Sequence, residues 1–159
     1  MSLAYVALGA NLGDPACTIR AAFGALANLP GSRVVRCSSL YRTAPVGLVD
    51  QPDFINAVAL LDTTLPPPLL LAELLAVEGR FGRRRRGVKN GPRSLDLDLL
   101  LYDAHRLDLP ELTLPHPRLH LRAFVLHPLA EIAPDLCLPG RGRLAAWLPA
   151  VACQTIVRL

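Results

Sequence analysis

The stretch PRSLDLDLLLY, residues 92–102, places two aspartates one residue apart in a run that is otherwise rich in leucine. Because side chains alternate between the two faces of a β-strand, a strand here separates these residues into two sets. One face carries leucines alone, namely Leu95, Leu97, Leu99 and Leu101. The opposite face carries Asp96, Asp98, Leu100 and Tyr102. The first face is typical of a helix-covered core. The second is polar at its start and apolar at its end, so it is not simply a face open to solvent.

Asp96 and Asp98 would lie about 7 Å apart along such a strand. At an effective dielectric constant of about 20, their carboxylates repel each other by roughly 2 kcal/mol. In one interpretation the pair lies on a wet sheet face, where water and nearby arginines screen this repulsion. In the other, the pair binds a divalent cation. Mg²⁺ takes one or two protein carboxylates and completes its coordination with water and phosphate oxygens.

Basic residues are concentrated directly upstream, in RFGRRRRGVKNGPR, residues 80–93. Carboxylates that hold Mg²⁺, next to arginines on a glycine-rich loop, are the groups that phosphoryl transfer needs, because cations neutralise the charge on phosphate oxygens. The combination favours a Mg-nucleotide phosphotransferase. GANLGD, residues 9–14, lacks the lysine and the GK[ST] ending of a P-loop.

The rest of the chain predicts a single domain over residues 1–159 with a βαββαβ order of elements. Strands are expected at 3–8, 33–41, 54–63 and in the leucine-rich stretch, with helices from Pro15 to about Leu29 and from about Pro66 to Gly82. A short helix is expected within 118–133, and a further helix and a short strand in the tail. This order predicts a ferredoxin-like α+β sandwich, a mostly antiparallel sheet with helices packed on one face, plus a C-terminal extension.

The composition, 52% hydrophobic and 19% charged, is that of a globular protein. No apolar run reaches the roughly 18 residues of a membrane span, and the N-terminus lacks the basic start of a secretory signal. The four cysteines have no CxxC spacing and three of them have apolar neighbours in the sequence, so we expect buried free thiols in a reducing, cytoplasmic location. The net charge of +4 indicates an anionic partner.

Several segments together resemble one known family. They are YVALGANLGD, SSLYRTAPVG, QPDFINAV, GPRSLDLDLLLY and LPHPRLHLRAFVLHPLAEIAP, in this order. The chain resembles, over essentially its whole length, the 6-hydroxymethyl-7,8-dihydropterin pyrophosphokinases of folate biosynthesis. The resemblance implies transfer of pyrophosphate from ATP to the hydroxymethyl oxygen of the pterin, with release of AMP. It implies two Mg²⁺ ions that bridge the triphosphate and the attacking hydroxyl, which is held in line with the β-phosphorus. The implied partners are the small molecules ATP and pterin, with no nucleic acid and no membrane, and we expect a monomer.

The resemblance also implies which residues are catalytic. Asp96 and Asp98 match the metal ligands, and Arg83 and Arg93 match arginines that contact the phosphates and stabilise the transferred charge. The alternative for Arg83 is a solvated loop residue, and the matching arginine within RRRR is defined only to within a position or two.

Three further residues match the ATP site of the family, in addition to the two arginines: Glu78, His116 and Arg122. The alternative for Glu78 is an ordinary exposed helix carboxylate. The sequence departs from some relatives at Asn90, Glu111 and Pro117, which affects how the site closes and how tightly it holds ATP, but not the metal ligands.

For the pterin, Phe54 and Phe124 match aromatic residues that stack on the ring, worth about 1 kcal/mol each beyond burial. The alternative is that both are core residues. Asn56 matches the amide that supplies donors and acceptors to the polar edge of the ring. The backbone of three residues completes that edge: Thr43, Ala44 and Val46.

Two other functions stay open on the sequence. One is a ferredoxin-like module that binds nucleic acid through the arginine run and exposed sheet aromatics. Two aspartates on the sheet argue against it, because they repel phosphate when no metal is bound. The other is a module that binds a small ligand without turnover, which fold analogy alone does not exclude.

Overall fold

The computed structural model describes residues 1–45, 50–82 and 94–159. Its centre is a six-stranded sheet in the order β10-β3-β4-β1-β5, with β2 also paired to β4, and every pairing in it is antiparallel. The strands are β1 (Ser2–Ala10), β2 (Ser32–Cys37), β3 (Tyr41–Thr43), β4 (Phe54–Thr63), β5 (Asp96–Tyr102) and β10 (Ile156–Arg158). The predicted α+β fold is confirmed, and the expected βαββαβ order gains one strand. The strand expected at 33–41 is two strands, β2 and β3, which pair with the two halves of β4.

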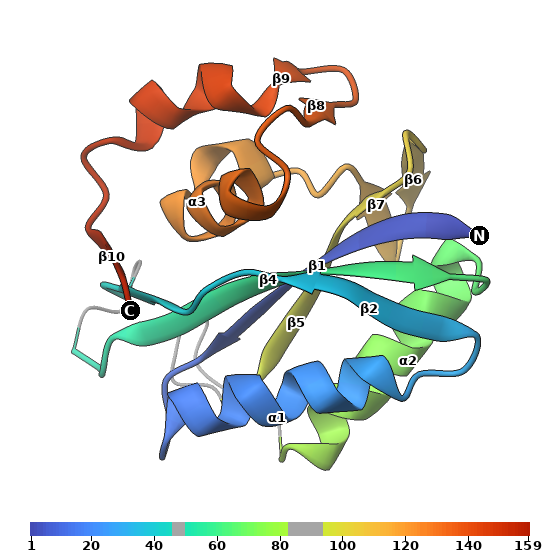
Figure 1. Ribbon diagram of the computed structural model, residues 1–159, viewed down its shortest axis with the longest axis horizontal. Helices are drawn as coiled ribbons and strands as arrows, with labels where there is room; N and C mark the ends of the chain where they lie inside the picture. The colour runs from blue at the N-terminus through green and yellow to red at the C-terminus, as the bar shows by residue number, and fades with distance from the viewer. Residues whose placement is uncertain (46–49, 83–93) are drawn as a thin grey trace.

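Helices cover both faces of this sheet (Figure 1). One face carries α1 (Pro15–Ala27) and α2 (Pro67–Arg80), and the other carries α3 (Ala123–Ile132) and the 3₁₀ helix η2 (Leu144–Val151). The two helices of the predicted βαββαβ unit share one face, as expected, and the C-terminal extension folds back over the second face, which the sequence did not predict. The remaining elements are short: β6 (Leu107–Leu109), β7 (Leu112–Leu114), η1 (Leu119–Leu121), β8 (Cys137–Leu138) and β9 (Gly142–Arg143). No helix in the described parts of the chain is long and apolar enough to cross a membrane.

The first helix begins where the sequence predicts. Asp14 caps α1, its Oδ1 accepting a hydrogen bond from the Cys17 N–H at 3.2 Å, and Pro15 occupies the first turn, where no N–H partner is needed. The buried positions of α1, Ile19 and Leu26 among them, recur at helical spacing and face the sheet.

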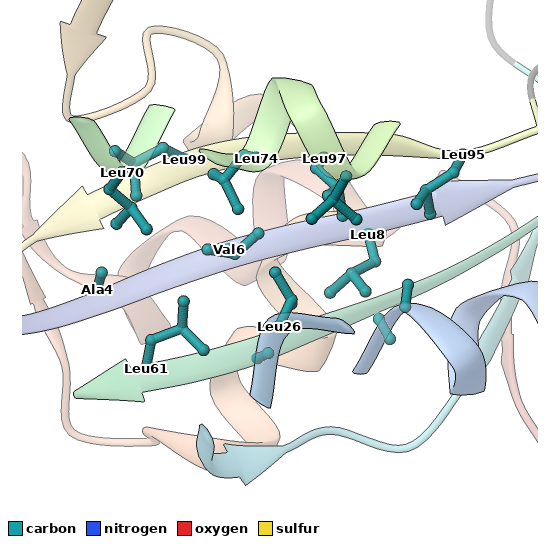
Figure 2. Packing of buried hydrophobic residues seen from close by; sticks show 14 of the residues in the cluster. Ala4, Val6, Leu8, Leu26, Leu61, Leu70, Leu74, Leu95, Leu97 and Leu99 are labelled. Carbon is teal, nitrogen blue, oxygen red and sulfur yellow. The ribbon is translucent and has the colours of Figure 1, made fainter. Parts of the chain in front are cut away.

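The core between this helix layer and the sheet is built mainly from leucine (Figure 2). Leu97 and Leu99 of β5, and Leu95 just before it, are buried here, as the alternation predicts, and they share the cluster with Leu70 and Leu74 of α2. Burial of each such side chain stabilises the fold by about 1.5–3 kcal/mol. This packing fixes β5 on the face covered by α1 and α2, and Asp96 and Asp98 lie on its other face.

A β-bulge interrupts the alternation of β5. Val6 of β1 pairs with Leu99, but Tyr5 pairs with Leu101, so Leu100 is an extra residue in the ladder. Leu100 and Leu101 consequently both belong to the core beneath α3, whereas Tyr102 returns to the core beneath α1 and α2. The prediction that Leu101 lies on the leucine face and Tyr102 on the aspartate face was wrong, because a strict period of two cannot anticipate an inserted residue.

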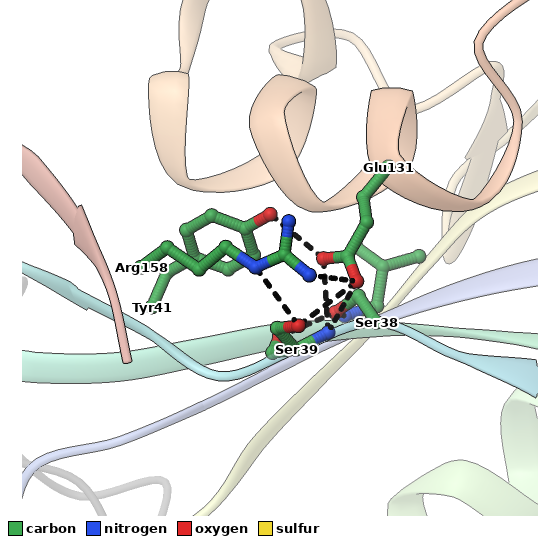
Figure 3. A network of polar contacts seen from close by, with 6 residues as sticks. Ser38, Ser39, Tyr41, Glu131 and Arg158 are labelled. Atoms are coloured by element: carbon green, nitrogen blue, oxygen red, sulfur yellow. Dashed lines mark hydrogen bonds and ion pairs between the residues drawn. The ribbon is translucent and has the colours of Figure 1, made fainter.

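The C-terminal layer is fastened to the sheet by a polar network around Glu131 of α3 (Figure 3). Its carboxylate accepts hydrogen bonds from the Tyr41 hydroxyl at 2.7 Å and from the Ser39 N–H at 2.9 Å, and it pairs with the Arg158 guanidinium at 3.3 Å. Burial acts to raise the pKa of Glu131, but these hydrogen bonds and the positive charge together lower it. Burial, and then the bond to Glu131, raise the pKa of Tyr41 to about 12.

The cysteines differ from expectation. All four, Cys17, Cys37, Cys137 and Cys153, are free thiols, but they are exposed rather than buried. Apolar neighbours in sequence do not place a residue in the core when it lies on the solvent side of its element.

Candidate active site

One row of residues crosses four strands of the sheet on the α3 face. Asn56 of β4 lies opposite Tyr41 of β3 and opposite Gly9 of β1, and Gly9 in turn lies opposite Asp96 of β5. Directly paired residues share a face. A Cβ atom at position 9 would stand 2.8 Å from the Asn56 Oδ1 atom. Glycine is therefore the residue that lets the amide of Asn56 and the carboxylate of Asp96 border the same open space.

That space is a central cavity of about 440 Å³ between the sheet and α3. Its lining comes from strands on one side and from η1, α3 and the tail on the other: Gly9, Thr43, Ala44, Phe54, Asn56, Asp96, Asp98, Arg118, Leu121, Arg122, Phe124 and Gln154. The volume is in the range of small-molecule sites, and the mixture of aromatic rings with a few polar groups is typical of them.

Asp96 and Asp98 border a second space as well. A flanking cavity of about 340 Å³ lies on the α2 and β7 side, and both aspartates line it together with Leu71, Glu78, Glu111, His116 and Pro117, among others. Both carboxylates are half-buried. The pair thus stands where the two cavities meet, which is the position from which one group can act on two ligands at once.

Glu78 holds the backbone between the two aspartates. It is 4% exposed and its Oε2 atom accepts a hydrogen bond from the Leu97 N–H at 2.8 Å. β5 is an edge strand of the sheet, and an edge presents backbone groups without a strand partner. The alternative that Glu78 is an exposed helix carboxylate was wrong, because it lies on the buried face of α2.

His116 lines the flanking cavity and is attached to the bulge. Its backbone N–H donates to the Leu100 carbonyl at 2.9 Å, and the Nδ1 atom of its ring accepts from the Arg118 backbone N–H at 3.2 Å. Burial lowers the pKa of His116 to about 4, and the nearby Arg122 and Arg118 guanidiniums act in the same direction. The imidazole is therefore neutral at pH 7, and with Nδ1 as an acceptor its proton lies on Nε2.

Arg122 and Phe124 enter the central cavity from the start of α3. Arg122 is the N-terminal flanking residue of that helix, and its Cζ atom lies 5.3 Å from the centroid of the Phe124 ring, a cation–π distance. The sequence grouped Arg122 with His116, whereas the structure places it in the central cavity with Phe124.

The residues predicted for the pterin lie together. Phe54 and Phe124 are half-buried and border the cavity from opposite walls, one on the sheet and one on α3. Phe124 also packs against the core beneath α3. Asn56 is buried and its Nδ2 atom donates to the Thr43 Oγ1 atom at 2.7 Å. This bond fixes the orientation of the amide and uses only one of its two N–H groups.

Some predicted site residues fall outside the described residues, namely Val46, Arg83 and Arg93. Other residues of the central cavity were missed by the sequence: Gly9, Arg118, Leu121 and Gln154. Arg118 carried a signal, since it stands between His116 and Arg122 in a basic segment. Gln154 carried none, because it reaches the site only through the folding of the tail.

Asp96 and Asp98 supply hard oxygen donors to the walls of the two cavities. Among the described residues, no group of three or more His, Cys, Asp and Glu side chains is placed to hold a metal ion by itself. Such a donor set does not fit a closed zinc site. It does fit Mg²⁺, which keeps water and takes phosphate oxygens beside one or two carboxylates.

Comparison with known proteins gives a consistent result. Residues 5–134 match the model of the family described as 7,8-dihydro-6-hydroxymethylpterin-pyrophosphokinase (HPPK). A 2-amino-4-hydroxy-6-hydroxymethyldihydropteridine pyrophosphokinase of Pseudomonas aeruginosa is 50% identical over 155 residues, which cover 98% of this chain and 95% of that protein. The enzyme of the same name from Haemophilus influenzae is 42% identical over 159 residues, covering 100% of this chain and 99% of that one.

The fold is also found among solved structures. A crystal structure of Plasmodium falciparum HPPK-DHPS with SDX-DHP superposes with a TM-score of 0.70 over 94% of this chain, at 14% sequence identity. The match covers 43% of that longer chain. At this identity the likeness concerns the fold alone.

Proposed function

Because the chain belongs to the 7,8-dihydro-6-hydroxymethylpterin-pyrophosphokinase family and is an ATP-dependent diphosphotransferase, we propose that it pyrophosphorylates 6-hydroxymethyl-7,8-dihydropterin in folate biosynthesis. The β- and γ-phosphates of ATP pass as one group to the hydroxymethyl oxygen, and AMP leaves. The observation that carries this proposal is the placement of Asp96 and Asp98 where the central and flanking cavities meet. A reaction that joins two small molecules needs charged groups that reach both.

The central cavity receives the pterin. Phe54 and Phe124 stack on its flat ring from the two walls, and Asn56 bonds its polar edge, with the backbone at Thr43 and Ala44, and at Val46, completing that edge. The fixed amide of Asn56 discriminates by hydrogen bonding, because a ring without matching donors and acceptors would leave buried polar groups unpaired. Gly9 leaves the floor open between this amide and the aspartates.

The flanking cavity receives the nucleotide. The neutral His116 presents an Nε2 N–H that can donate to a phosphate oxygen without adding positive charge. Glu78 keeps the backbone between the aspartates in place from within the core. The proposed charge-neutralising groups for the transferred pyrophosphate are Arg83 and Arg93, with Arg122 directed from the central cavity.

Asp96 and Asp98 would hold Mg²⁺, and we propose two ions as in the family pattern. When bound, Mg²⁺ screens the charge of the triphosphate oxygens and lowers the repulsion that an attacking oxygen meets. The chain itself contributes orientation: the stacked pterin presents its hydroxymethyl oxygen beside the aspartates, where it would stand in line with the β-phosphorus of an ATP that enters from the flanking cavity. Holding two reactants in this way can supply several kcal/mol of the barrier reduction, about 7–11 at most.

We further propose that residues 1–159 act as one domain and that the protein is a monomer with ATP and pterin as its partners. Family membership favours turnover over the two binding-module alternatives, since the relatives named above are enzymes.

Incubation with Mg-ATP and 6-hydroxymethyl-7,8-dihydropterin, followed by separation of the nucleotides, tests the function. We expect AMP that forms only when the pterin and Mg²⁺ are both present. Formation of ADP, or no turnover by folded protein, would contradict the proposal. Omission of the pterin and removal of the metal by a chelator are the matched controls.

A further inference from the structure

Gln154 lies in the segment between η2 and β10 and touches the backbone on both sides of Arg122. Its Nε2 atom donates to the Leu121 carbonyl at 2.9 Å, and its Oε1 atom accepts from the Ala123 N–H at 2.9 Å. It also lines the central cavity. The residue stands beyond positions 5–134, the part of the chain that the family model matches.

The two backbone groups belong to helix ends. The Leu121 carbonyl closes η1, and the Ala123 N–H is the first of α3. The first N–H groups of a helix have no partner within that helix. Arg122 between them is extended, with φ −124° and ψ 116°, and makes no side-chain cap. The primary amide of Gln154 thus pairs with this extended residue as a neighbouring strand would, and it holds the turn from η1 into α3.

The held turn directs two walls of the site. Arg122 is the residue that the amide spans, and Phe124 follows one residue after the bonded N–H. Both side chains border the central cavity, and the guanidinium lies over the ring. A rotation of the backbone at Arg122 would therefore move the aromatic wall and a positive charge together.

We propose that Gln154 is a positioning residue of the active site, which sets Arg122 and Phe124 through their backbone from the C-terminal extension. The inference rests on the proposed function for its kinetic test. It deepens that function by assigning a role to a residue outside residues 5–134, the part of the chain that the family model matches.

The test compares Gln154→Ala and Gln154→Glu with Arg158→Ala. Glutamate keeps the size of the side chain and the acceptor for Ala123, but it cannot donate to the Leu121 carbonyl. Arg158→Ala loosens the same C-terminal segment at the Glu131 network, away from Arg122. If Gln154 had a merely structural role, kcat/KM for the pterin would fall in each of the three variants in proportion to that variant's loss of thermal stability.

We expect both Gln154 variants to lower kcat/KM for the pterin by about tenfold, since misplacement by a fraction of an ångström to one ångström costs that much or more. Arg158→Ala should stay within about twofold of wild type. Values for both Gln154 variants within twofold of wild type, or an equal loss in Arg158→Ala, would overturn the proposal.

A second measurement does not depend on turnover. Amide hydrogen exchange at Ala123 should be slow in the wild type, although first-turn amides are ordinarily unprotected. It should become fast in Gln154→Ala and stay slow in Arg158→Ala. Fast exchange at Ala123 in the wild type would overturn the positioning role of Gln154 even if the enzyme is active. Absence of pterin-dependent AMP in the wild type would instead overturn the proposed function, and exchange at Ala123 would still decide whether Gln154 holds the backbone at Arg122.

Discussion

Asp96 and Asp98 are the proposed metal ligands, and their electrostatics differ between the empty and the occupied site. Two half-buried carboxylates on one strand face repel each other by roughly 2 kcal/mol, and the proposed binding of cations would relieve this repulsion. A pair that disfavours the empty state in this way increases the difference in free energy between the empty and the occupied site.

Asp96→Asn and Asp98→Asn should therefore separate activity from stability. We expect each to lower turnover by at least about 100-fold, the upper range for residues that merely support metal ligands. The free energy of unfolding of the metal-free protein should stay unchanged or rise by up to about 2 kcal/mol, because a like-charge contact is removed. Steady-state rates and urea unfolding without Mg²⁺ check both expectations. Asp108→Asn, at an exposed carboxylate of β6, is the control, and near-wild-type turnover in either site variant would contradict the metal role.

Gly9→Ala tests the floor of the central cavity. The added Cβ atom would stand 2.8 Å from the Asn56 Oδ1 atom, so the amide must shift. We expect KM for the pterin to rise about tenfold with a smaller effect on KM for ATP, as a displaced polar contact costs about 1–3 kcal/mol. Gly24→Ala is the matched control, because a Cβ atom there meets nothing within 4 Å. Relief of a helical glycine should instead stabilise the fold by about 0.5–1 kcal/mol. An unchanged pterin KM in Gly9→Ala would contradict the close approach.

At the scale of elements, α3 depends on its attachment to β3 and β10. The carboxylate of Glu131 has a lowered pKa, so the stability that it contributes is complete above its ordinary value of 4.5 and is lost as the pH falls through the lowered value. The Tyr41 hydroxyl has a pKa raised from 10.0 to about 12, so its contribution is complete below 10.0 and is lost as the pH rises toward 12.

Glu131→Gln should consequently lower the free energy of unfolding at neutral pH by about 1.5–3 kcal/mol, the range for hydrogen bonds to a charged group. The loss relative to wild type should shrink as the pH falls below 4.5. Urea unfolding at a series of pH values measures both. Asp62→Asn, which removes a partner of the largely exposed Arg33, is the control and should cost less than about 1 kcal/mol. A constant difference between Glu131→Gln and wild type over this range would contradict the role given to the carboxylate.

The elements also show which parts of the structure can be predicted from the sequence. Asp14 and Pro15 correctly predicted the start of α1, and the alternation of side chains correctly predicted that Leu95, Leu97 and Leu99 are buried. The bulge at β5, the break between β2 and β3 and the second helix layer were not predicted, because each depends on pairing or packing between segments far apart in the chain. At the site, the residues proposed as metal ligands and the two aromatic residues of the central cavity could be named from sequence, and their roles stay predictions. Gln154 could not be named from sequence, because its proposed role depends on the backbone groups of Leu121 and Ala123 that it contacts only in the folded chain.

At the scale of the whole molecule, two cores share one sheet. The core beneath α1 and α2 and the core beneath α3 and η2 both take residues from β1, β4 and β5. Neither helix layer has a sheet of its own on which to fold, so loss of one should destabilise the other.

We therefore expect cooperative unfolding of the proposed single domain. Trp147 is the only tryptophan and lies in η2, so its fluorescence reports the C-terminal layer, whereas far-ultraviolet circular dichroism reports mainly the longer helices α1 and α2. The two urea transitions should coincide in midpoint, as in a two-state domain. A fluorescence transition at clearly lower urea would show that the C-terminal layer detaches first. ATP and pterin, which bind only the folded state, should shift both transitions together.

The bulge at Leu100 divides β5 into two stretches that tolerate different mutations. Ahead of it, we expect a polar substitution at an odd-numbered position to damage the core, whereas a substitution at Asp96 or Asp98 should damage the proposed metal site and leave the core intact. Beyond it, Leu100 and Leu101 are both buried beneath α3 and Tyr102 beneath α2, so no position is left for a polar residue. A library of variants along this strand, sorted by growth under folate limitation, would therefore tolerate no polar substitution from Leu100 onward. The tolerance of polar residues would alternate from position to position before Leu100 and would be absent at every position of the strand from Leu100 to its end.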